Sequence, residues 1–212
     1  MFKNRIQAGD VLAEELSHID LDNALLLAVP RGGVVVAVPA ARRLGLPIGV
    51  LITRKLGHPL NPEVAIGAVM PDGSAMYDAQ TMARLGLGDD DLNKLIEQEY
   101  LEIKRRLAVY TGSEDAPAIS NRTVLLIDDG IATGYTLYAA VKWLKTLTPQ
   151  KIIIAVPVAP PEVISSLAAQ VDMVICPLQP PDFTSVGMHY QDFSQTTDAE
   201  VIHILNDLKQ EK

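Results

Sequence analysis

The sequence predicts an α/β protein in which helices cover both faces of a central, mostly parallel sheet. Aliphatic runs of strand length recur along the chain, and they are continuous rather than alternating, as in strands buried on both faces. Segments with apolar residues at helical spacing separate several of these runs, and the order strand, helix, strand is typical of a parallel sheet. The strands are expected at residues 24–29, 48–53, 64–69, 124–127, 152–158 and 173–176, and the intervening helices at 35–44, 136–147 and 162–169.

Further elements complete one predicted domain over residues 1–212, with its core at about 20–178. A long helix is expected from the acidic cluster at Asp89 to the basic cluster that ends at Arg106, because these charges complement the helix dipole. The polar segment 112–121 is expected to be a surface connection. The remainder, about 179–212, is rich in Pro and aromatic residues and ends in an amphipathic helix at 198–208, so we expect a small C-terminal hood.

The composition indicates a folded protein with a sizeable core and an acidic surface. The chain has 212 residues, of which 48% are hydrophobic and 21% charged, which excludes a disordered tail or a small disulfide-bonded domain. Its net charge of −8 repels phosphate backbones and anionic lipids, so neither nucleic acid nor a membrane is an expected partner. Cys176 is the only cysteine and no apolar run approaches the ~20 residues of a membrane span, so a cytoplasmic location is expected.

The segment 124–136 contains the most specific chemical signal. Aliphatic residues lead directly to Asp128 and Asp129, and a turn of small residues then opens a helix. In an open parallel sheet this order puts both carboxylates at the carboxyl edge, where ligands bind. The N–H groups at the helix start and the hydroxyls of Thr133 and Thr136 are suited to a phosphate. Because carboxylates repel a phosphate, the acids are suited instead to sugar hydroxyls or a hydrated Mg²⁺, and the segment predicts a site for a phosphorylated sugar.

This segment resembles the phosphoribosyl diphosphate (PRPP) signature of the type I phosphoribosyltransferases: four hydrophobic residues, two acids, two further residues and a small-Thr-Gly-x-Thr loop. The resemblance implies the fold of that family and the transfer of a 5-phosphoribosyl group with release of diphosphate. It implies that Asp128 and Asp129 bind the ribose hydroxyls, with Mg²⁺ held mainly by PRPP and the two acids nearby. The PRPP-binding residues implied beyond these acids are Gly130, Ala132, Thr133, Gly134, Tyr135 and Thr136.

Two further segments are similar to other phosphate-binding parts of the family, although each alone also fits an ordinary turn. Arg54 and Lys55 resemble the Arg-Lys pair that ends the corresponding strand in the adenine branch of the family, just before a flexible lid. In this chain the corresponding lid would be residues 57–63. The resemblance implies that Arg31 and Lys55, with Arg54 second, stabilise the leaving diphosphate, and we group Asp129 with them as candidate catalytic residues. The diphosphate loop that follows the first strand consists of Pro30, Arg31, Gly32 and Gly33.

The sequence specifies the acceptor base least. The hypoxanthine and guanine branch of the family has an acid at the position of Ala132, so the resemblance argues against a 6-oxopurine enzyme of that branch. Aromatic side chains of the hood could stack on a planar base, and packing of the hood on the sheet also explains them. The candidates for contact with the base are His58, Phe183, Tyr190 and Phe193.

One other function uses the same pocket. A regulatory protein that senses PRPP or a nucleotide without catalysis would bind the same ligand, but the Arg54–Lys55 pair favours an enzyme, because a sensor needs no lid over a leaving group. A dinucleotide-binding domain is excluded because no Gly-x-Gly-x-x-Gly follows a strand, and the Walker A pattern is also absent. The family is often dimeric, so the resemblance is compatible with a homodimer.

Overall fold

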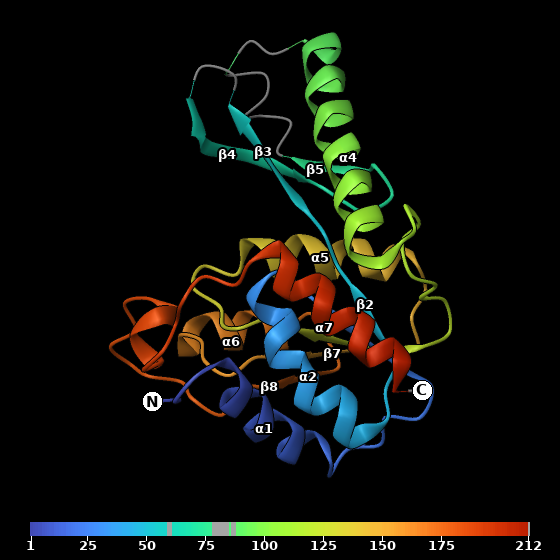
Figure 1. Ribbon diagram of the computed structural model, residues 1–212. Helices are drawn as coiled ribbons and strands as arrows, with labels where there is room; N and C mark the ends of the chain where they lie inside the picture. Colours follow the sequence, from blue (N-terminus) through green and yellow to red (C-terminus); the bar gives the residue numbers. More distant parts are fainter. Residues whose placement is uncertain (59–60, 78–84, 86–87, 212) are drawn as a thin grey trace. The chain divides into compact units, whose positions relative to one another are not determined.

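The computed structural model describes residues 1–58, 61–77, 85 and 88–211, and the chain divides into two compact units (Figure 1). The first unit consists of Met1–Leu51 and Pro117–Lys212, and the second of Ile52–Ala116. Each unit has a sheet of its own, and the PRPP signature lies in the first. The single domain expected from the sequence stays a prediction.

The first unit is built on a five-stranded parallel sheet with the order β2-β1-β6-β7-β8, which confirms the predicted fold class. All residues of β1 and β6 are buried, as their continuous aliphatic sequences predict. Ala28 pairs with Ile127, so β1 and β6 end side by side. The strands are β1 (Ala24–Ala28), β2 (Ile48–Val50), β6 (Thr123–Ile127), β7 (Lys151–Ala155) and β8 (Met173–Ile175).

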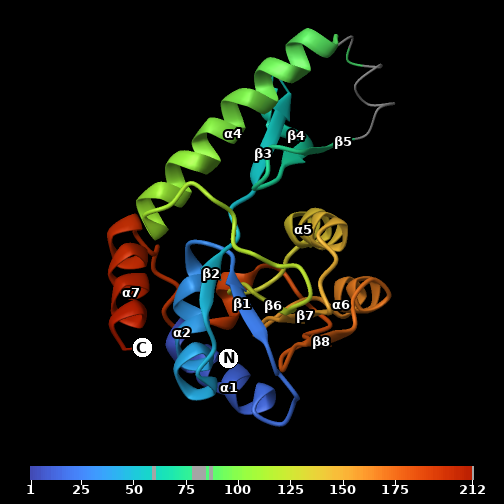
Figure 2. The same ribbon diagram turned by 90° about the vertical axis from the view of Figure 1, so that its right-hand side faces the viewer.

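Helices cover both faces of this sheet, with α1, α2 and α7 on one side and α5 and α6 on the other (Figure 2). Sequence reasoning placed the start of the core near residue 20 and missed α1, which buries Ala8, Leu12 and Leu16 against α2. None of the helices within the described residues has both the length and the apolar composition that crossing a membrane requires. The helices are α1 (Arg5–Leu16), α2 (Gly32–Leu44), α5 (Tyr135–Thr146), α6 (Pro161–Ala168) and α7 (Asp198–Gln210).

The described residues of the second unit form a three-stranded antiparallel sheet and one long helix, α4 (Asp89–Thr111). The run at 64–69 is therefore a strand, but its expected place in the parallel sheet was wrong. Successive strands with a short connection pair antiparallel, and β3 ends only shortly before β4 begins. The helix α4 also runs past its predicted end at Arg106 to a left-handed cap at Gly112, with φ of 78°. The strands are β3 (Arg54–His58), β4 (Asn61–Val69) and β5 (Ala75–Tyr77).

The C-terminal segment packs against the start of the chain. The backbone N–H of Phe2 donates to the carbonyl of His189 at 2.8 Å, and the N–H of Gln191 donates to the carbonyl of Phe2 at 2.8 Å. The short 3-10 helix η1 (Val186–His189) lies in this segment. The side chains of Phe2, Ala8, Val158 and Tyr190 form a buried apolar cluster there, which joins the N-terminal residues to the C-terminal segment.

Candidate functional site

The parallel sheet brings the acidic pair and the predicted diphosphate loop together. The N–H of Val29, just after β1, donates to the carbonyl of Ile127 at 2.8 Å, so the segments that follow β1 and β6 leave the sheet side by side. A Cβ atom on Gly32 would overlap the Oδ2 atom of Asp129 and would lie 2.7 Å from Nε of Arg5. Glycine is therefore required at this position because the side chains of Asp129 and Arg5 lie so close to its Cα, and not because of its backbone dihedral angles. The peptide bond between Pro30 and Arg31 is cis.

Both acids are held in place by hydrogen bonds. The N–H of Asp129 donates to Oδ1 of Asp128 at 2.8 Å, Nε of Arg5 donates to Oδ2 of Asp129 at 2.8 Å, and the Tyr190 hydroxyl donates to the carbonyl of Asp129 at 2.6 Å. Burial raises the pKa of Asp128 well above its ordinary value, and the charge of Asp129 raises it further. Burial also raises the pKa of Asp129, and Arg5 opposes that rise. Two desolvated carboxyls at one edge of a sheet are the arrangement expected at a ligand site.

Asp128→Asn is expected to stabilise the unliganded protein at pH 7. Because the pKa of Asp128 is raised on folding, the folded state binds this proton more tightly, and its ionisation lowers the free energy of unfolding as pH rises above about 4. Asparagine keeps an oxygen for the Asp129 N–H and removes the charge. We expect a Tm increase of about 2–4 °C, which corresponds to ~1 kcal/mol for a domain of this size.

Thermal unfolding of both proteins between pH 4 and 8 measures this effect. The Tm difference between the Asp128→Asn variant and the unaltered protein should shrink as pH falls, since the Asp128 carboxyl then becomes neutral in the unaltered protein as well. A Tm difference that stays the same across the range, or a variant less stable at pH 7, would contradict the electrostatic cause.

The predicted phosphate loop is open to solvent at the start of α5. The side chains of Ala132, Thr133 and Thr136 are exposed, and Tyr135 is 80% exposed, so its ring points away from the core. Gly134 is the N-cap of α5 and has a φ of 77°, a left-handed conformation that favours glycine. The first N–H groups of a helix have no intrahelical acceptor, so those of this loop are available to an anion.

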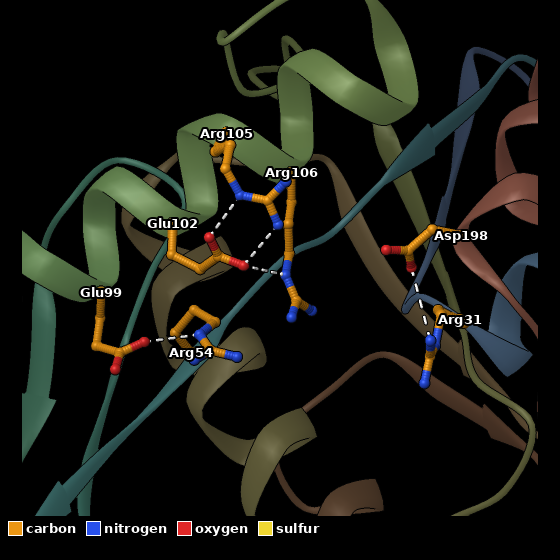
Figure 3. A network of polar contacts seen from close by, with 7 residues as sticks. All are labelled: Arg31, Arg54, Glu99, Glu102, Arg105, Arg106 and Asp198. Carbon is orange, nitrogen blue, oxygen red and sulfur yellow. Dashed lines mark hydrogen bonds and ion pairs between the residues drawn. The ribbon is translucent and has the colours of Figure 1, made fainter.

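Two of the predicted cations are paired with carboxylates from helices (Figure 3). In the first unit, Nη1 of Arg31 lies 3.7 Å from Oδ1 of Asp198, the first residue of α7. In the second unit, Nε of Arg54 donates to Oε2 of Glu99 on α4 at 2.6 Å. Lys55 lies next to Arg54 on β3 and is exposed. Arg31 therefore belongs to the same unit as the acidic pair, whereas Arg54 and Lys55 belong to the other.

The second unit also includes the predicted lid. His58 ends β3, but its side chain lies outside the described residues, as do residues 59 and 60 of the lid. A role for His58 in contact with a base, and the lid itself, stay predictions.

The aromatic residues of the hood pack on one another and on the N-terminal segment. Tyr190 is only 5% exposed, and its ring centroid lies 5.5 Å from that of Phe2 and 5.0 Å from that of Phe193. The ring of Phe183 stacks on His189 at 5.5 Å. These contacts favour the packing interpretation for Tyr190, and contact of Phe183 or Phe193 with a base stays a prediction.

The hood also covers the end of the acidic segment. A Cβ atom on Gly130 would lie 2.5 Å from Cγ1 of Val186. Gly130 therefore makes room for the C-terminal segment.

Sequence reasoning missed one residue at the site, Arg5. No motif links it to Asp129, which lies 124 positions further along the chain. The helical spacing of Ala8, Leu12 and Leu16 could have identified α1 itself, with Asn4 as its N-cap. The contact between the helix and the acidic pair depends on tertiary packing and has no such local signal.

The side chains of the site supply only some of the oxygen ligands that a metal ion needs. Among the described residues, no group of three or more His, Cys, Asp or Glu side chains is arranged to hold a metal ion. Asp128 and Asp129 supply two carboxylates, and one oxygen of each already accepts a hydrogen bond. This donor set fits Mg²⁺, which keeps several waters and takes one or two carboxylates together with ligand phosphates.

Comparisons with known proteins agree with this geometry. Residues 3–192 match the family described as the phosphoribosyl transferase domain. Over 206 residues the chain is 34% identical to proteins from two strains of Mycobacterium tuberculosis, each named "Putative phosphoribosyl transferase". That match covers 97% of this chain and 46% of each relative, so the chain spans about half the length of the curated relatives it matches. The crystal structure of the protein TT1426 from Thermus thermophilus matches with a TM-score of 0.82 and 36% identity, covering 98% of each chain.

Proposed function

Because this chain belongs to the phosphoribosyl transferase domain family, we propose that it transfers the 5-phosphoribosyl group of PRPP to a nitrogenous base or related heterocycle and releases diphosphate. The main support is the convergence of three segments at the carboxyl edge of the parallel sheet. These are the acidic pair after β6, the loop after β1, and the open loop at the start of α5. A sugar that has free hydroxyls and carries phosphate groups at two positions is complementary to this set of groups.

Each segment has a distinct role in the proposed reaction. Asp128 and Asp129 accept hydrogen bonds from the ribose hydroxyls, and the N–H groups of residues 132–136 bind the 5′-phosphate. Arg31 donates to the diphosphate. The bond between C1 of the ribose and the diphosphate oxygen breaks, its electron pair leaves with the oxygen, and a nitrogen of the base forms the new bond to C1 from the opposite face. The attacking nitrogen then releases its proton to solvent water.

Catalysis in this scheme consists of positioning and of stabilising the leaving charge. Mg²⁺, when bound, would neutralise part of the diphosphate charge, and Asp128 and Asp129 are the residues that would hold it through its waters. A role for Lys55 and Arg54 at the diphosphate, and a lid at 57–63 that excludes water from PRPP, stay predictions from the family resemblance.

The proposed function is tested with a panel of purine, pyrimidine and related bases, each incubated with PRPP and Mg²⁺ while diphosphate release is measured. We expect release that depends on one class of base and exceeds the hydrolysis seen without base. Ala132 leads us to expect no release with hypoxanthine or guanine. Tight PRPP binding without release for any base would favour the PRPP sensor, and absence of PRPP binding would overturn both functions.

A further inference from the structure

The carboxylate of Asp129 is held by a residue from the opposite end of the chain. Nε of Arg5, in the first turn of α1, donates to Oδ2 of Asp129 at 2.8 Å. The two side chains are only 11% and 17% exposed, so this ion pair is largely shielded from solvent. A surface ion pair contributes little to orientation, but a shielded pair with a direct hydrogen bond restricts both side chains.

The guanidinium of Arg5 is itself fixed by the C-terminal segment. Its Nη1 donates to the carbonyl of Ser194 at 2.7 Å, and its central carbon lies 3.9 Å from the ring centroid of Phe193. One hydrogen bond, one ion pair and one cation–π contact therefore hold the planar group in a single orientation.

A second contact fixes the backbone of the same acid. The Tyr190 hydroxyl donates to the carbonyl of Asp129 at 2.6 Å, and burial raises the pKa of Tyr190, so this hydroxyl stays protonated. Asp129 is thus held through both its side chain and its carbonyl by residues outside the PRPP signature. The side-chain contact is the hydrogen bond from Arg5 to Oδ2.

We propose that Arg5 is a positioning residue, which orients the Asp129 carboxylate to accept hydrogen bonds from the ribose hydroxyls of PRPP. This inference rests on the proposed function, because it needs PRPP as the ligand. Arg5 provides this orientation through its hydrogen bond to Oδ2 of Asp129, and its own guanidinium is fixed by Ser194 and Phe193.

Binding of two ligands to Arg5→Ala tests this role. PRPP contains the ribose, whereas inorganic diphosphate contains only the group assigned to Arg31. Partners that orient ligating side chains typically change affinity by about 10- to 100-fold when removed, and we expect a loss of that size for PRPP. The affinity for diphosphate should stay unchanged. An equal loss for both ligands, or no loss for PRPP, would overturn the positioning role.

A conservative variant and a double variant give a second readout. Arg5→Lys should recover part of the PRPP affinity, because an ammonium supplies the charge without the planar contacts. In Asp129→Asn, Arg5→Ala should cause little further loss if Arg5 acts through this acid. No recovery in Arg5→Lys, or fully additive losses, would contradict the proposal.

Two further variants control for misfolding. Arg42→Ala removes an arginine of the same unit whose guanidinium pairs with Glu211 at the surface, and it should bind PRPP like the unaltered protein. If Arg5→Ala fails to fold, Phe193→Leu keeps Arg5 and removes only the ring beneath it, and a smaller loss of the same PRPP-selective kind is expected. If the unaltered protein does not bind PRPP, the proposed function fails, whereas PRPP binding that ignores Arg5 refutes only the positioning role.

Discussion

Replacing Arg31 by alanine is expected to lower kcat by about 100- to 1,000-fold, the range seen when a group that stabilises developing charge is removed. Arg31 follows β1 directly and belongs to the same unit as the acidic pair. If it neutralises the leaving diphosphate, its contribution is larger in the transition state than in the bound ground state. The KM for PRPP should therefore change much less than kcat, as measured by steady-state diphosphate release.

Two variants separate this role from a general loss of positive charge. Arg43→Ala removes an arginine at the far end of the same helix, where it pairs with Glu14, and should leave kcat unchanged. Asp198→Asn leaves Arg31 in place and removes its carboxylate partner, so diphosphate should bind at least as tightly as before. A rise in KM with unchanged kcat for Arg31→Ala would mean that Arg31 only anchors PRPP.

Gly32→Ala is expected to lower kcat/KM for PRPP by roughly 100-fold, the loss that a displacement of about 1 Å at a reacting site can cause. Alanine suits a helical backbone at the start of α2, but its methyl group would occupy the position of Oδ2 of Asp129. The carboxylate would have to leave Arg5 to make room. Thermal unfolding should show a folded protein, because the obstructing atoms belong to side chains.

The matched control is Gly88→Ala at the N-cap of α4. There φ is −76°, and an added methyl meets no atom of the described residues within 4 Å. This variant should keep the activity of the unaltered protein. Unchanged kcat/KM in Gly32→Ala would show that the Asp129 carboxylate can shift without loss of PRPP binding, and would weaken the role assigned to both residues.

Local sequence patterns predicted the elements that build the candidate site. Continuous aliphatic runs mark β1 and β6 as strands buried on both faces, and small residues mark the turns that follow them. Because parallel strands end at the same edge of a sheet, the motifs after β1 and β6 lie next to each other, as the register of Ala28 with Ile127 shows. Membership of the predicted family is confirmed by the match over residues 3–192.

The same patterns did not indicate whether a strand pairs parallel or antiparallel with its neighbour. The run at 64–69 has the aliphatic composition of a buried strand, but composition reports burial and not the direction of the partner. Its place in an antiparallel sheet follows from the short connection to the preceding strand. The predicted end of α4 was also wrong. A basic cluster favours a helix end, but the helix continues to Thr111, where Gly112 caps it.

By itself, then, the sequence determined the fold class, the family and the segment proposed to bind the sugar phosphate, because each depends on neighbouring residues whose spacing reflects local geometry. Only the tertiary structure decided that Arg5 donates a hydrogen bond to Asp129. It also decided that Tyr190 contacts Asp129 and that Phe193 contacts Arg5, both from the C-terminal part of the chain. Contacts between residues far apart in the sequence depend on which faces pack together, and short-range periodicity contains no information about that choice.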